Sequence, residues 1–154
     1  CCSDSVVRFS DPPIRIKSLE CLNYRSLRYE NQDLRPYQVL TGPTGAGKTS
    51  FLDGLGFLSD LVGLGLEETI SRRGGRLDDL IWRKQARGLE LAVELPIPEP
   101  RQTLMLPEHR FTRCRYEIGV GTNPESDETG ILSEKVLLLG EIRKPTSEEQ
   151  PSLF

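Results

Sequence analysis

Residues 42–49 read Gly-Pro-Thr-Gly-Ala-Gly-Lys-Thr and match the pattern Gly-x-x-x-x-Gly-Lys-Thr of the Walker A phosphate-binding loop. Glycines at these spacings let the backbone curl, so that successive N–H groups point at phosphate oxygens. Lys48 is expected to reach the β- and γ-phosphates of a nucleotide and to act catalytically by neutralising developing charge. The Thr49 hydroxyl is the expected Mg²⁺ ligand. The spacing therefore predicts a site for ATP with Mg²⁺.

The predicted nucleotide contacts form one continuous run through the loop and into the element that follows it. They are Gly42, Thr44, Gly45, Ala46, Gly47, Lys48, Thr49 and Ser50. A short apolar strand is expected before the loop at Tyr37–Leu40, and an amphipathic helix after it over Phe51–Val62. The helix would place its positive end at the loop. Because both flanking elements are indicated, the pattern favours a phosphate site over a glycine-rich turn without a ligand.

Length and composition set broad limits on the protein. A chain of 154 residues is expected to form one domain, and 36% hydrophobic residues with 11 prolines indicate that part of it is loop or tail. The net charge of −3 gives no overall signal for nucleic acid or a membrane surface. The sequence has no run of 18 apolar residues, no signal-peptide pattern and no zinc or redox spacing among its four cysteines. A cytoplasmic protein with reduced cysteines is expected.

The hydrophobic pattern divides the chain into a lead-in at residues 1–13, a nucleotide-binding lobe at 14–143 and a tail at 144–154. Two strands that pair antiparallel are expected before the loop, and a short helix after the long one. Alternating patterns predict further antiparallel strands between about 88 and 140. These late strands are joined by loops and not by helices, unlike those of a nucleotide kinase. The expected fold class is α/β, with a mixed and largely antiparallel sheet around the helix of a P-loop NTPase.

Several stretches resemble a known family. Ile16–Leu27, the spacer Asp33–Pro36 and Val39–Asp53 are similar to the amino-terminal half of ABC-type ATPases of the RecF/SMC/OLD kind. The similarity is closest to the predicted bacterial AAA-family ATPases of that superfamily. Arg72–Gly75 and Asp78–Trp82 resemble the same group. The phosphate-binding loop is the most specific part of the likeness.

The resemblance implies an ATP-binding lobe that dimerises head to tail over ATP. Such ATPases maintain, repair or defend DNA, including against phage, sometimes beside a nuclease, so DNA and a nuclease are implied partners. It also implies that Arg25 and Ser26 approach the nucleotide. The alternative, a turn with a solvated Arg25, stays open at this level.

Catalysis in this family needs an apolar strand ending in Asp-Glu, a signature helix of the Ser-Gly-Gly type and a switch histidine. Val136–Glu141 resembles the acidic strand only superficially, because Gly140 stands where the Asp is needed. His109 is the only histidine, and Gln85 and Gln102 are the candidates for a Mg²⁺-contacting glutamine. We therefore expect the first lobe of a two-part ATPase. A carboxy-terminal half or a second subunit, as a homo- or heterodimer, would complete it and make it an enzyme.

Other interpretations remain open from the sequence. The chain could be a nucleotide-dependent interaction module that recruits a partner such as a nuclease without catalysis of its own. The last five residues, Gln150–Phe154, are similar to the peptide by which repair proteins bind the sliding clamp, although an unstructured chain end is the better explanation of so short a match. Two basic clusters could contact DNA phosphate or be solvated faces: Arg72, Arg73 and Arg76, and Arg110, Arg113 and Arg115.

Overall fold

The computed structural model describes residues 15–105 and 111–140. Predictions that concern other parts of the chain lie outside these ranges. They are those for the lead-in at 1–13, Cys1, Cys2, His109, Arg110, Glu141, the tail at 144–154 and its peptide Gln150–Phe154.

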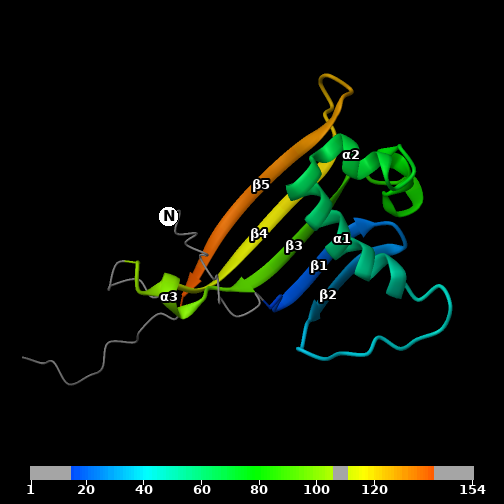
Figure 1. The fold of residues 1–154 in the computed structure, drawn as a ribbon. Coiled ribbons are helices and arrows are strands. Elements are labelled where there is room, and N and C mark those ends of the chain that lie inside the picture. The colour runs from blue at the N-terminus through cyan, green and yellow to red at the C-terminus, as the bar shows by residue number, and fades with distance from the viewer. Residues whose placement is uncertain (1–14, 106–110, 141–154) are drawn as a thin grey trace, which may run out of the picture.

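The described residues form one five-stranded antiparallel sheet in the order β2-β1-β3-β4-β5, with helices on one face (Figure 1). The strands are β1 Ser18–Tyr24, β2 Leu27–Asp33, β3 Gly88–Pro96, β4 Phe111–Thr122 and β5 Thr129–Gly140. The helices are α1 Lys48–Leu64, α2 Leu66–Ser71 and α3 Glu99–Gln102, with 3₁₀ turns η1 Leu77–Asp79 and η2 Trp82–Lys84. The predicted antiparallel pair, long helix, short helix and later strands are confirmed.

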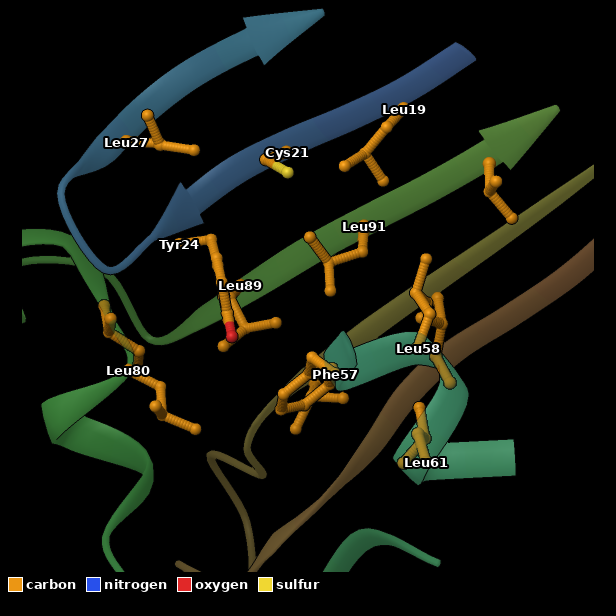
Figure 2. Packing of buried hydrophobic residues seen from close by; sticks show 14 of the residues in the cluster. Leu19, Cys21, Tyr24, Leu27, Phe57, Leu58, Leu61, Leu80, Leu89 and Leu91 are labelled. Atoms are coloured by element: carbon orange, nitrogen blue, oxygen red, sulfur yellow. The ribbon is translucent and has the colours of Figure 1, made fainter. Parts of the chain in front are cut away.

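The core lies between α1 and the face of the sheet formed by β1, β3 and β4. Period-two alternation brings Leu91 opposite Cys21 on one side and opposite Ile118 on the other. Figure 2 shows Leu91 and Cys21 on the side of the sheet that faces Phe57 and Leu58 of α1. All five side chains are buried. The helical and strand periodicities in the sequence therefore meet in one apolar layer.

Gly54 sets how closely α1 approaches the sheet. A Cβ atom at Gly54 would lie 3.2 Å from Cys21 Sγ, 3.7 Å from Leu19 and 3.8 Å from Leu91. A glycine inside a helix costs about 1 kcal/mol relative to alanine. At position 54 the glycine allows a close contact between helix and sheet that a larger side chain would prevent.

The opposite face of the sheet is polar, and Arg115 lies at its centre. Its guanidinium pairs with Glu20 on β1 and with Glu117 on its own strand, and Glu94 is 3.9 Å away. The hydrogen bond from Arg115 lowers the pKa of Glu20, against the opposing effect of partial burial. No helix of the described residues covers this face (Figure 1).

The strand predicted at Tyr37–Leu40 is wrong. These residues form neither helix nor strand, and Tyr37 and Val39 are 96% and 85% exposed. A strand needs a neighbour to satisfy its backbone N–H and C=O groups. Every described strand belongs to the antiparallel sheet, and none of them pairs with this segment. The described sheet is wholly antiparallel, whereas a mixed, largely antiparallel sheet was expected, and the strand that should precede the loop is not formed.

Replacing Gly54 with leucine is expected to lower the free energy of unfolding by about 1–3 kcal/mol, because the side chain must force α1 away from Cys21. Urea unfolding monitored by circular dichroism measures the change. Gly63→Ala is the matched control, since a Cβ there meets nothing within 4 Å, and it should stabilise the helix by up to about 1 kcal/mol. Equal effects of the two substitutions would contradict the close contact at Gly54.

The Glu20–Arg115 pair should make stability depend on pH. Because the pKa of Glu20 is lowered in the folded state, the stabilisation is present above the ordinary carboxyl pKa and is lost as the pH falls through the folded-state value. Glu20→Gln should therefore reduce the loss of unfolding free energy between pH 7 and pH 3. Glu67→Gln, at an exposed position without an ion pair among the described residues, serves as the control. An unchanged acid slope in Glu20→Gln would rule out this contribution.

Candidate phosphate-binding site

The loop at residues 42–49 has the backbone conformation that its glycines predict. Gly45 and Gly47 have φ values of 86° and 89°, in the left-handed region that glycine adopts without steric cost. The Ala46 N–H donates to the Pro43 carbonyl at 3.2 Å and closes a turn inside the loop. Helix α1 then begins at Lys48. The glycines therefore shape a tight turn that leads directly into a helix.

Lys48 folds back over this turn. Its Nζ donates to the carbonyl oxygens of Gly42 at 2.6 Å and Pro43 at 2.7 Å. These two bonds hold the ammonium group at the mouth of the loop, where phosphate oxygens would compete with the carbonyls for its protons.

The start of α1 leaves backbone donors free. Among the described residues, no backbone or side-chain group accepts from the N–H of Lys48, Thr49 or Ser50. Gly47 precedes them as the N-cap and has no side chain with which to bond them. The positive end of a 17-residue helix and three unused donors therefore lie at one place. Such an arrangement can bind an anion such as phosphate.

The turn between β1 and β2 packs directly against the loop. Ser26 Oγ lies 2.7 Å from Ser50 Oγ, and a Cβ at Gly47 would lie only 2.5 Å from Leu27 Cδ2. Arg25 has a φ of 50°, and its N–H donates to the Leu80 carbonyl at 2.7 Å. The structure thus places Ser26 against the first turn of α1 and Arg25 beside Asp53 on the same helix.

Asp53 joins the turn to α1 and was not identified as a site residue from the sequence. Its carboxylate lies 2.7 Å from Arg25 Nε and 3.2 Å from Arg73 Nε, and it accepts a hydrogen bond from the Tyr24 hydroxyl. Arg73 also pairs with Asp60 at 2.7 Å. We call these five residues the Asp53 cluster. The available signal was the spacing of Asp53, four residues after Thr49 and hence on the same side of the helix.

The pKa values of two members reflect burial within the cluster. Burial raises the pKa of Tyr24, and the hydrogen bond to Asp53 raises it further, so the hydroxyl stays protonated as a donor. Burial alone would lower the pKa of Arg73, but the bond to Asp60 and the charge of Asp53 outweigh it, and the net shift is upward. Both donors therefore keep their protons throughout the physiological range.

The basic residues singled out from the sequence are engaged by acids. Only 8% of the Arg73 side chain is exposed, so it cannot form part of a DNA-binding surface with Arg72 and Arg76. Arg113 pairs with Glu94, and Arg115 with Glu20. The interpretation of the first cluster as a three-residue DNA contact is therefore wrong for Arg73.

Neither candidate for a Mg²⁺-contacting glutamine meets the loop in this structure. The Gln102 amide donates to the Ile97 carbonyl at 2.5 Å and belongs to α3, at the end of the sheet remote from α1 (Figure 1). Gln85 ends the η2 turn through a backbone bond to Trp82. No group of three or more His, Cys, Asp or Glu in the described chain could hold a metal ion by itself. Mg²⁺ would accordingly depend on Thr49, whose residue is exposed, and on oxygens of the bound phosphate.

A groove of about 310 Å³ opens beside the loop, and β2 forms its other wall. It is lined by Leu27, Glu30, Gln32, Val39, Leu40, Thr41, Ala46, Gly47, Lys48 and Phe51. A larger hollow of about 620 Å³ lies between α2 and the β4–β5 hairpin, away from the loop. We assign the phosphate site to the smaller groove because the lysine and the helix start lie there.

Comparison with known proteins adds no relative: neither a protein-family model nor a curated protein matches the chain. Across residues 15–105 and 111–140, no helix combines the length and apolar character that crossing a membrane requires.

Two alanine substitutions in the loop should differ in cost. A Cβ at Gly45 meets nothing within 4 Å, so Gly45→Ala causes no collision. Its only cost is that of an alanine in the left-handed region, about 1–2 kcal/mol. Gly47→Ala adds a collision with Leu27 and should lower the free energy of unfolding further. Urea unfolding in the wild-type and Leu27→Ala backgrounds measures both. The excess cost of Gly47→Ala should shrink when Leu27 is truncated; an unchanged excess would show that this contact is not its origin.

Proposed function

We propose that this chain is the ATP- and Mg²⁺-binding lobe of a RecF/SMC/OLD-like ATPase that acts in DNA maintenance or anti-phage defence in the cytoplasm. The observation that carries the proposal is the phosphate-binding loop, in which Lys48 lies over the turn and free N–H groups open at the start of α1. A lysine ammonium beside several backbone N–H donors suits a polyphosphate, so a nucleotide is the ligand that we propose.

Two uncovered surfaces support a lobe that is completed by other protein. The segment at 37–40 is apolar and exposed, which suits a strand that forms only beside a further strand. On the α1 side of the sheet, Val136 and Leu138 lie opposite Tyr116 and Cys114 but are 63% and 47% exposed. Apolar surface of this kind is typical of an interface. A carboxy-terminal half or a second subunit would cover it.

In the proposed mechanism, ATP holds two lobes together and hydrolysis releases them. The N–H groups from Gly45 to Ser50 bind phosphate oxygens, and Lys48 neutralises charge as it develops on the γ-phosphate. Thr49 helps to hold Mg²⁺, which bridges the phosphates when bound. The group that orients the attacking water comes from the second half, since the sequence holds no Asp-Glu strand of the required kind.

A second candidate function is a nucleotide-dependent interaction module that recruits a partner such as a nuclease. The long edge strand β5 favours it, because Ile131, Val136 and Leu137 are exposed along its 12 residues. The two candidates share the ATP site and differ in whether the completed assembly hydrolyses ATP.

Lys48→Ala should weaken ATP binding by about tenfold or more, because it removes a charged hydrogen-bond donor worth about 1.5–3 kcal/mol. Isothermal titration calorimetry of the 154-residue chain with ATP and Mg²⁺ measures the affinity. Lys84→Ala removes the same charge at η2 and should leave the affinity unchanged. The chain alone should bind ATP but hydrolyse it negligibly. Robust hydrolysis by this chain that depends on Lys48 would refute the two-part mechanism.

A further inference from the structure

We infer that Asp53 is a positioning residue for the nucleotide site: its carboxylate fixes Arg25 so that the outer end of the guanidinium is presented to the bound phosphates. The inference rests on the proposed function, and it assigns to the Asp53 cluster a role that follows from its contacts. Asp53 itself would not touch the ligand.

The side chain of Arg25 is held from within. Its Nε is buried and lies 2.7 Å from Asp53 Oδ2, an ion-pair contact without the geometry of a hydrogen bond, and 35% of the side chain stays exposed. The exposed part is therefore directed away from the carboxylate. A guanidinium carries five N–H donors in a rigid plane, so an ion pair at Nε limits where the terminal nitrogens can lie.

The backbone that carries Arg25 is fixed on both sides. Its N–H is bonded to Leu80, and the next residue, Ser26, contacts Ser50 in the first turn of α1. Asp53 lies one helical turn after Thr49, on the same helix. Arg25 is thus attached through Asp53 to α1, the helix whose start forms the proposed phosphate site. The Asp53 carboxylate lies one helical turn from that start.

Asp53 is in turn supported by groups that do not face the site. The Tyr24 hydroxyl donates to Oδ2, and Arg73, which is nearly buried, binds Oδ1. Arg73 is itself placed by Asp60 and by the Phe57 ring, whose centroid is 5.5 Å from the guanidinium carbon. A carboxylate bonded on both oxygens has a fixed orientation, as a group that positions another must have.

Removing the charge of Asp53 should change ATP affinity in opposite directions, depending on whether Asp53 acts through its net charge or by orienting Arg25. Removing the negative charge of Asp53 near an anion site should strengthen ATP binding if only net charge matters. If Asp53 acts by orienting Arg25, the same substitution should weaken it. The sign of the change therefore separates the two explanations.

The test is a double-mutant cycle on the 154-residue chain, with ATP and Mg²⁺ affinity measured by calorimetry. Asp53→Asn should weaken ATP binding by about tenfold in the wild-type background and have little effect when Arg25 is already alanine. Glu68→Gln, which removes a carboxylate that pairs with Arg72 outside the Asp53 cluster, should leave ATP affinity within about twofold. Unchanged or tighter binding by Asp53→Asn, or an equal loss in both backgrounds, would overturn the inference.

A ligand comparison and a second variant cover loss of folding. Asp53→Asn should reduce affinity for ATP and for inorganic tripolyphosphate alike but not for adenosine, whereas general damage to the site would reduce all three. If circular dichroism shows that Asp53→Asn is unfolded, Arg25→Lys is the variant that tests the inference. Lysine keeps the positive charge but has no planar guanidinium with which to bind Asp53 and phosphate at once. The ATP affinity of Arg25→Lys should therefore fall about tenfold. Retained affinity in Arg25→Lys would overturn the inference. Absence of ATP binding by the wild-type chain would instead refute the proposed function.

Discussion

The rest of the structure depends on how α1 is attached to the sheet. At Gly54 the helix backbone comes close enough to β1 that a single added carbon would press on Cys21. One residue earlier, Asp53 binds Tyr24 and Arg25 at the end of the same strand. A close apolar contact and a group of charged bonds therefore fix α1 at neighbouring positions. The phosphate-binding loop is the start of this helix, so its location follows from that attachment.

The charges of the Asp53 cluster balance one another at a partly buried position. Two carboxylates, of Asp53 and Asp60, meet the guanidinium groups of Arg25 and Arg73, and the Tyr24 hydroxyl supplies a further donor. Such a network is weak grounds for stability, because desolvation of the ions offsets much of their attraction. Its directional bonds do define one relative orientation of turn, helix and loop. A defined orientation of this kind is required in a binding site, whereas a hydrophobic core does not depend on it.

The molecule is covered unevenly. Helix α1 lies over the part of the sheet around β1 and β3 (Figure 1). Apolar side chains of β5 and of the segment before the loop are exposed. The loop is organised although the strand expected before it is not formed. Local hydrogen bonds suffice to shape a glycine turn, while a strand depends on a neighbour.

The sequence by itself determined the features that nearby residues control: the alternation of β1 to β5, the apolar face of α1, and the loop whose glycines at 45 and 47 permit left-handed backbone. Only the tertiary structure decided which groups meet. It left Tyr37–Leu40 without a strand partner, and it buried Arg73, which sequence composition placed on a basic surface. It also joined Asp53 to Arg73 across 20 residues. Periodicity and backbone freedom are local properties, whereas burial and charge pairing depend on residues far apart in the chain.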